Sequence, residues 1–192
     1  GITNPEIDIT EIRQRKLVCP TTTGGINWNS VGYSPQTNAL YAPTNNTCMD
    51  YYLNPVNPTV GGYHSSAVSL KIPVPEGDGQ IGIFTAVDVA TGEALWTYQQ
   101  RAAITGSVLT TGGGLAFVTD DARKFRAFDV DTGEILWEQI LNSSAGGFPT
   151  TFSVDGIQYL AIAAGGGVNH RTLTPEIRQR SGGNMLFVFR LP

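Results

Sequence analysis

Two glycines and an isoleucine stand before an asparagine and a tryptophan near the start of the chain, in the stretch Thr21–Trp28. Glycine lets the backbone pass close to another group, and glycines ahead of a polar–aromatic pair suit a backbone that must pass close to something planar. The pair Asn27-Trp28 is therefore a candidate for binding a planar ligand. On spacing alone, the residues favour two structural roles instead: a turn in which Asn27 bonds to the backbone, and a core position for the Trp28 ring.

The two cysteines of the chain, Cys19 and Cys48, flank this stretch at a separation of 29 residues. A disulfide between them would close a loop of hairpin size, stabilise the fold by about 3 kcal/mol and indicate an oxidising compartment. Two buried free thiols fit the same count. A metal pair is disfavoured, because neither cysteine has a second Cys or His at ligand spacing.

Aspartates and histidines supply the other candidates for metal or acid–base chemistry. They are Asp120, Asp121, Asp129, Asp131, His64 and His170. We expect the first aspartate pair to lie in a solvated loop and the second pair to belong to a turn. Neither histidine has a partner at ligand spacing, so ordinary polar surface or loop roles are expected for both.

These candidates must be positioned by an element that occurs twice, at Ala86–Trp96 and Ala127–Trp137. The copies start 41 residues apart and agree at 8 of 11 positions. Each copy has the pattern of a strand ending in Asp, a turn over Thr-Gly and a strand ending in Trp. A repeat of about 40 residues is typical of a propeller blade or a helical repeat, and the turn residues favour the blade. The sequence predicts an all-β fold, a β-propeller whose tryptophans dock each blade onto its neighbour.

Composition agrees with many short strands, because the chain has 23 Gly, 11 Pro and 15% charged residues. At this repeat length the chain holds about four blades, which is the lower limit for known propellers. We therefore expect residues 1–192 to be one part of a propeller domain, completed by residues or a chain outside it. The net charge of −4 argues against a nucleic-acid partner. No apolar run reaches the roughly 18 residues of a membrane span.

The interval 49–80 departs from the blade pattern, since prolines and glycines recur through it. Long loops of this kind are usually functional or mobile. Aromatic residues in Met49–Tyr52 and at Tyr63 could line the entrance of a pocket, or they could anchor the loop.

The repeated pattern Ala-x-Asp-x-x-Thr-Gly-Glu-x-Leu-Trp resembles the tryptophan-docking motif of the quinoprotein dehydrogenases. These enzymes are eight-bladed propellers that carry pyrroloquinoline quinone (PQQ) and calcium. Further segments resemble the Gly-Gly-x-Asn-Trp region and the closing blades of this family, and they are Gly24–Asn29, Tyr33–Tyr41, Leu109–Phe117, Val154–Ile162 and Gly165–Gly167. The resemblance covers most of residues 17–192 and only the C-terminal part of such an enzyme.

This resemblance implies a periplasmic dehydrogenase that oxidises an alcohol, polyol or sugar by hydride transfer to PQQ. It implies that Asn27 lies beside the PQQ ring system, that Trp28 packs at the edge of the site, and that Cys19 and Cys48 form a disulfide. The family's base aspartate and calcium ligands precede the Gly-Gly-x-Asn-Trp segment, so no catalytic or metal residue is expected in this chain. The glycines 165–167 could approach a PQQ carboxylate or form a tight turn.

The resemblance also implies partners. These are the upstream half of the propeller or a companion chain, an alcohol or sugar substrate, and a separate electron acceptor such as a cytochrome or ubiquinone, since the chain has no haem-attachment motif. Thr105 and Val168-Asn169 stand where some family members have tryptophans, which favours an open pocket for a larger alcohol, polyol or sugar. The alternative interpretation is a non-catalytic propeller scaffold for protein binding or outer-membrane assembly.

Overall fold

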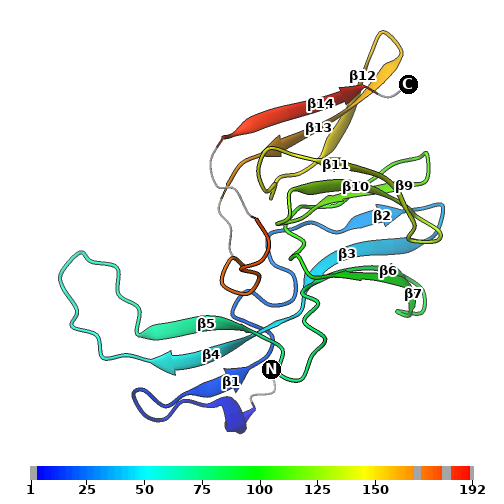
Figure 1. Ribbon diagram of the computed structural model, residues 1–192. Helices are drawn as coiled ribbons and strands as arrows, with labels where there is room; N and C mark the ends of the chain where they lie inside the picture. The colour runs from blue at the N-terminus through cyan, green and yellow to red at the C-terminus, as the bar shows by residue number, and fades with distance from the viewer. Residues whose placement is uncertain (1–3, 167–169, 179–182, 191–192) are drawn as a thin grey trace.

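The computed structural model describes residues 4–166, 170–178 and 183–190 of the chain. Within them, every regular element except the 3-10 turn η1 (Pro5–Ile7) is a β-strand. The strands form four sheets in which all neighbouring strands run antiparallel. Three of the sheets follow one another as a fan of blades, and the fourth lies to one side (Figure 1). The prediction of a partial propeller is confirmed.

The first blade has the strand order β2 (Gly32–Ser34), β3 (Ala39–Asn45), β6 (Gly82–Asp88) and β7 (Ala94–Gln100). The second blade has β8 (Leu109–Thr110), β9 (Leu115–Thr119), β10 (Lys124–Asp129) and β11 (Ile135–Ile140). The third has three strands, β12 (Thr150–Val154), β13 (Ile157–Ala164) and β14 (Met185–Arg190). The two copies of the sequence repeat are therefore the strand pairs β6–β7 and β10–β11.

Each repeat copy turns as its residues predict. The carboxylate of Asp129 accepts hydrogen bonds from the backbone N–H groups of Asp131 and Thr132, both at 2.9 Å. The carboxylate of Asp88 does the same in the first copy, at 2.8 Å to Ala90 and Thr91. These bonds hold the chain in the tight turn that joins the two strands. The interpretation of Asp129 and Asp131 as turn residues is confirmed.

Tryptophan docking joins the first two blades. The Trp96 indole Nε1 donates a hydrogen bond of 2.9 Å to the carbonyl oxygen of Val130 in the second blade. Its ring lies nearly parallel to Phe128, at an interplanar angle of 12°, and meets Phe84 edge-on. A buried aromatic pair of this kind contributes about 0.5–1.5 kcal/mol beyond the area it removes from water. The second copy, Trp137, packs edge-on against Phe125 and Phe189 between the second and third blades.

The fourth sheet consists of β1 (Lys16–Val18), β4 (Thr47–Leu53) and β5 (Ala67–Pro73), in the order β1-β4-β5. Its strands β4 and β5 are an insertion between β3 and β6 of the first blade. The expected long irregular excursion over 49–80 is therefore only partly correct, because β4 and β5 pair over seven residues each. The repeat length predicted about four blades, whereas the described residues form three blades and this additional sheet.

A disulfide bond links Cys19 to Cys48. It connects the segment that follows β1 to the buried start of β4, so it fastens the N-terminal part of the chain to the inserted sheet. The disulfide implied by the family resemblance is confirmed, and the alternative of two free thiols is excluded. Within the described part of the chain, no helix has the length and apolar character needed to cross a bilayer.

Candidate functional site

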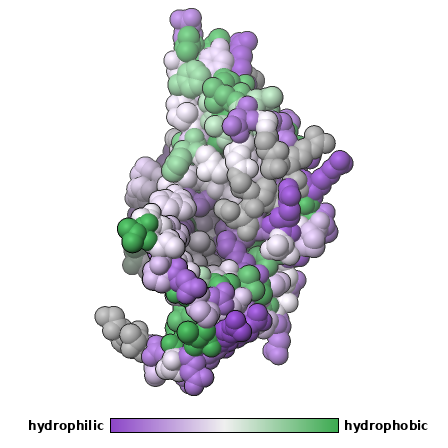
Figure 2. All heavy atoms as spheres, turned by 90° about the vertical axis from the view of Figure 1, so that its left-hand side faces the viewer, coloured by the Kyte–Doolittle hydropathy of each residue, from purple (hydrophilic) through white to green (hydrophobic). Residues whose placement is uncertain are grey.

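A pocket of about 480 Å³ lies where the loops that lead into the three blades meet the inserted sheet. Its walls come from the segment before β2, the segments before β8 and β12, the end of β13 and strand β5. Figure 2 views the molecule from this side and shows hydrophilic residues around the hollow. A volume of this size is typical of pockets that hold small organic ligands or cofactors.

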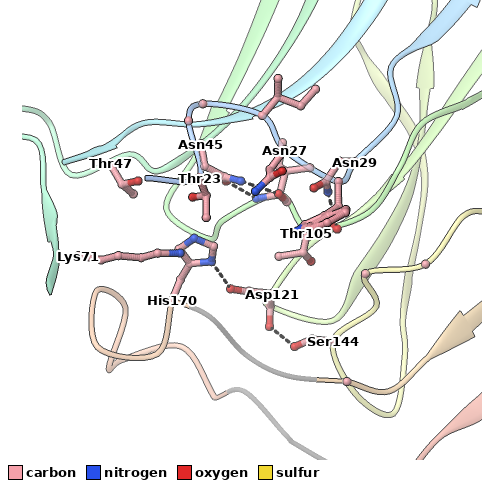
Figure 3. Close-up of a pocket in the computed structure, with 18 of the residues that line it drawn as sticks. Thr23, Asn27, Asn29, Asn45, Thr47, Lys71, Thr105, Asp121, Ser144 and His170 are labelled. Atoms are coloured by element: carbon pink, nitrogen blue, oxygen red, sulfur yellow. Dashed lines mark hydrogen bonds and ion pairs between the residues drawn. The ribbon is translucent and has the colours of Figure 1, made fainter. Parts of the chain in front are cut away.

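Asn27 and Trp28 both line this pocket. The Trp28 side chain is 86% exposed, so the alternative of a core ring is excluded. The Asn27 amide has no hydrogen-bond partner among the described residues, so a turn-stabilising bond to the backbone is not formed there. The Asn27 amide without a partner (Figure 3) and the exposed Trp28 indole are thus sequence neighbours that line one pocket.

Two further asparagines hold the wall in place. Asn45, at the end of β3, accepts a hydrogen bond of 2.9 Å from the Ile104 N–H and donates one of 2.8 Å to the Ile104 carbonyl. Asn29 donates to the carbonyl oxygens of Thr105 and Gly106. These amides tie the first blade to the loop that enters the second blade. Asn29 belongs to the segment Gly24–Asn29 of the family resemblance. Nothing in the sequence around Asn45 indicated that this residue would link two blades.

Thr105 makes the equivalent link to the third blade. Its hydroxyl donates a hydrogen bond of 3.1 Å to the carbonyl of Ala145, and the buried Thr119 hydroxyl donates to the same oxygen at 2.6 Å. Thr105 also lines the pocket. By the family resemblance, some members have the larger tryptophan side chain at this position.

Asp120 and Asp121 are buried, and the prediction of a solvated loop for them is wrong. Asp120 is 1% exposed because its carboxylate pairs with Arg126 at 2.7 Å and accepts a bond from Gln100 at 3.0 Å. Asp121 is fully buried, and its Oδ2 lies 3.1 Å from Nδ1 of His170. Among the described residues, no group of three or more His, Cys, Asp or Glu side chains is arranged to hold a metal ion.

His170 lies in a loop, as one of the two expected roles allowed, but it is buried at the pocket wall, so the surface role is wrong. A carboxylate can only accept hydrogen bonds, so Nδ1 of His170 is the donor to Asp121. The hydroxyl of Ser144 donates to the backbone oxygen of Asp121 at 2.9 Å and fixes this loop. His64, by contrast, lies on an exposed turn where its Nε2 is 2.9 Å from the N–H of Thr59.

Lys71 reaches the pocket from strand β5 of the inserted sheet. Burial lowers the pKa of Lys71 below its ordinary value, and the charge of Asp121 offsets part of this effect. Sequence reasoning missed Lys71 because its strand fell in the expected irregular interval. The aromatic residues suggested for the pocket entrance do not line it: Tyr63 is 94% exposed, and the inserted segment contributes Thr47 and Lys71 instead.

Gly165 and Gly166 line the pocket with φ angles of 126° and 134°, which favour glycine. The N–H of Gly165 donates to the Ser144 carbonyl at 3.0 Å, so it is already used in an inter-strand link. The third glycine, Gly167, and the following Val168-Asn169 lie outside the described residues.

Comparisons with known proteins agree with the fold. The family model described as "PQQ: Glucose/ethanol/alcohol dehydrogenase, beta-propeller domain" matches residues 99–160. A lanthanide-dependent methanol dehydrogenase of Methylacidiphilum fumariolicum (strain SolV) is 36% identical over 154 residues, which are 79% of this chain and 25% of that protein. The 1-butanol dehydrogenase (quinone) of Thauera butanivorans is 34% identical over 184 residues, which are 92% of this chain and 28% of the relative.

Among solved structures, a europium-containing methanol dehydrogenase superposes with a TM-score of 0.80 at 31% identity. The match covers 92% of this chain and 35% of that structure. This chain thus spans about a quarter to a third of the length of the relatives it matches.

Proposed function

The chain belongs to the quinoprotein alcohol dehydrogenase family, and we propose that it forms the C-terminal portion of a PQQ-dependent dehydrogenase that oxidises an alcohol, polyol or sugar. In this proposal residues 1–192 are part of a single propeller domain, completed by an upstream half or a companion chain. The pocket at the blade loops is then one wall of the cofactor site.

The observation that carries the proposal is the convergence of Asn27 and Trp28 on that pocket, each without a structural role that would explain it. The Asn27 amide can donate to a quinone oxygen in the oxidised and the reduced state of a cofactor, because it carries no charge of its own. The exposed Trp28 ring offers an apolar surface to the edge of a planar ring system. The pocket volume of about 480 Å³ accommodates a tricyclic molecule with room beside it.

PQQ held here would supply the hydride acceptor for alcohol oxidation, and a metal ion would supply Lewis-acid activation of the quinone. The residues of this chain would position the quinone: Asn27 by a hydrogen bond, Trp28 by packing, and Thr105 by leaving the neighbouring space open. Two relatives are named for a lanthanide, one in general terms and one for europium, which supports a lanthanide ion in those enzymes. We propose calcium or a lanthanide, with ligands supplied by the upstream part.

A separate electron acceptor, a cytochrome or ubiquinone, completes the proposed reaction. One group of relatives is named methanol dehydrogenase [cytochrome c] subunit 1, which supports a cytochrome for those enzymes. The disulfide between Cys19 and Cys48 supports an oxidising compartment, and we propose the periplasm.

Titration of PQQ into the chain combined with its upstream half tests the proposal, with quenching of tryptophan fluorescence as the signal. We expect saturable binding that weakens about tenfold in Asn27→Ala, the loss expected for one hydrogen bond. The matched control Asn57→Ala, at an exposed position of the inserted loop, should bind as the parent protein does. Absence of saturable binding would instead favour the non-catalytic scaffold.

A second measurement separates the chain from the complete enzyme. Because the base and the metal ligands are proposed to lie upstream, the 192-residue chain with PQQ and calcium should not reduce a dye in the presence of alcohols. Dye reduction by the chain alone would contradict the proposed division of the site.

A further inference from the structure

Three side chains with an unpartnered polar atom meet on the side of the pocket that faces the inserted sheet. The atoms are Nζ of Lys71, Nε2 of His170 and Oδ1 of Asp121, of which Oδ1 is itself buried from solvent. All three residues line the pocket, and none of these atoms has a hydrogen-bond partner among the described residues. Figure 3 shows Lys71 pointing toward His170 on one side, with Asn27 and Asn29 on the other.

The cluster is rigidly supported. Oδ2 of the fully buried Asp121 accepts the hydrogen bond of His170 Nδ1 at 3.1 Å, which fixes the imidazole ring and its tautomer. With its proton on Nδ1, an imidazole ring has Nε2 as its acceptor atom. Ser144 holds the backbone of Asp121 at 2.9 Å. Lys71 comes from β5, a strand that pairs over seven residues with β4, so its backbone is also fixed.

The charges of the cluster are balanced. Among the described residues that line the pocket, Lys71 is the one Lys or Arg and Asp121 is the one Asp or Glu, so one positive charge faces one negative charge. The remaining polar lining consists of amides, hydroxyls and the His170 ring. A wall of this kind offers both donors and acceptors, so it suits a ligand group that donates and accepts hydrogen bonds at once, as a hydroxyl does.

We propose that Lys71 and His170, the latter held by Asp121, bind a second hydroxyl of the substrate, remote from the carbon that is oxidised, and that the substrate is therefore a polyhydroxylated alcohol such as a polyol or a sugar. This inference rests on the proposed function. A hydroxyl accepts a hydrogen bond from the Lys71 ammonium and donates one to Nε2 of His170, whose ring Asp121 holds in place. A simple alkanol leaves these buried groups unpaired, and sites built to hydrogen-bond a hydroxyl discriminate strongly against analogues that lack it.

The test uses the complete PQQ-loaded enzyme and substrate pairs of equal carbon number, 1-propanol with glycerol and 1-hexanol with sorbitol. Lys71→Met keeps the aliphatic stem and removes the ammonium, whereas His170→Asn retains a donor for Asp121 and removes Nε2. In each variant we expect kcat/KM for the polyols to fall about 10- to 100-fold, and that for the alkanols to change less than about threefold. The control is His64→Asn, at the exposed turn outside the pocket.

Two binding measurements accompany the kinetics. Calorimetry with the PQQ-loaded enzyme, without an electron acceptor, should show weaker sorbitol binding in Lys71→Met and in His170→Asn. The dissociation constant for PQQ should stay the same. Equal losses for polyols and alkanols, or a loss confined to PQQ affinity, would overturn the inference and leave the proposed function standing. A parent enzyme that binds PQQ but oxidises no alcohol would overturn the proposed function itself.

Discussion

Replacing Gly133 with alanine tests how Trp96 docks on the next blade. A Cβ atom at Gly133 would lie 2.6 Å from the Trp96 ring, closer than packed carbon atoms come. Gly92 is the same position in the first repeat copy, and no described residue lies within 4 Å of a Cβ placed there. The φ angles of the two glycines are +72° and +76°, so alanine meets nearly the same backbone strain at both. The pair therefore separates backbone strain from the contact with tryptophan.

The magnitudes follow from these two effects. A left-handed conformation costs a non-glycine residue about 1–2 kcal/mol, so Gly92→Ala should lower the free energy of unfolding by that amount. Gly133→Ala adds overpacking against Trp96, about 1–3 kcal/mol, which displaces the ring from its bond to the Val130 carbonyl. We expect Gly133→Ala to be the more destabilising variant by about 1–3 kcal/mol.

Urea unfolding of the 192-residue chain, followed by far-UV circular dichroism, measures both variants. Repeating the Gly133→Ala substitution in a Trp96→Leu background closes a double-mutant cycle. Without the indole, the cost of alanine at Gly133 should fall to the cost measured at Gly92. Equal costs for the two glycine substitutions in the parent background would refute the docking geometry.

Three further predictions concern the supporting structure. Arg126→Met should destabilise the chain by about 3–5 kcal/mol in urea unfolding, because it leaves Asp120 buried without its ion-pair partner; a change below 1 kcal/mol would show that the pair contributes little. Cys19→Ser should cost about 3 kcal/mol, and the parent chain under reducing conditions should lose the same amount. Hydrogen bonds from the backbone and hydroxyl of Thr132 lower the pKa of Asp129 below its ordinary 3.8. The stability it contributes is therefore complete above that value and lost as the pH falls through the lower folded pKa; Asp129→Asn should remove this part of the acid dependence between pH 5 and pH 2, and an unchanged acid profile would contradict the assignment.

The turn and docking features could be predicted because their causes are local in sequence. Asp129, Gly133 and Trp137 lie within one repeat, and each acts through its own hydrogen bond, backbone angle or ring. A second copy at the same spacing showed that the pattern was structural. Asn27 and Trp28 could be assigned to a ligand pocket only with help from the family resemblance, since spacing alone favoured structural roles for them.

The charged side of the pocket could not be predicted, because its residues meet only in the folded chain. Asp121 and His170 are 49 positions apart, and each stands alone in the sequence. Two adjacent aspartates in a turn normally indicate solvent exposure, but Asp120 is neutralised by Arg126 from the next strand. The irregular composition around Lys71 concealed a strand, since prolines and glycines at both ends outweighed its alternation.

The pocket is shaped by hydrogen bonds between neighbouring blades. Asn45 of the first blade holds both backbone groups of Ile104, and Thr119 of the second blade holds the carbonyl of Ala145. Each blade thus fixes the loop that leads into the next one. Asn27 and Trp28 make no such link, which leaves them available to a ligand while their surroundings are held rigid. A preorganised binding site requires this arrangement, in which the backbone around the pocket is held by hydrogen bonds and the side chains proposed to bind the ligand make none.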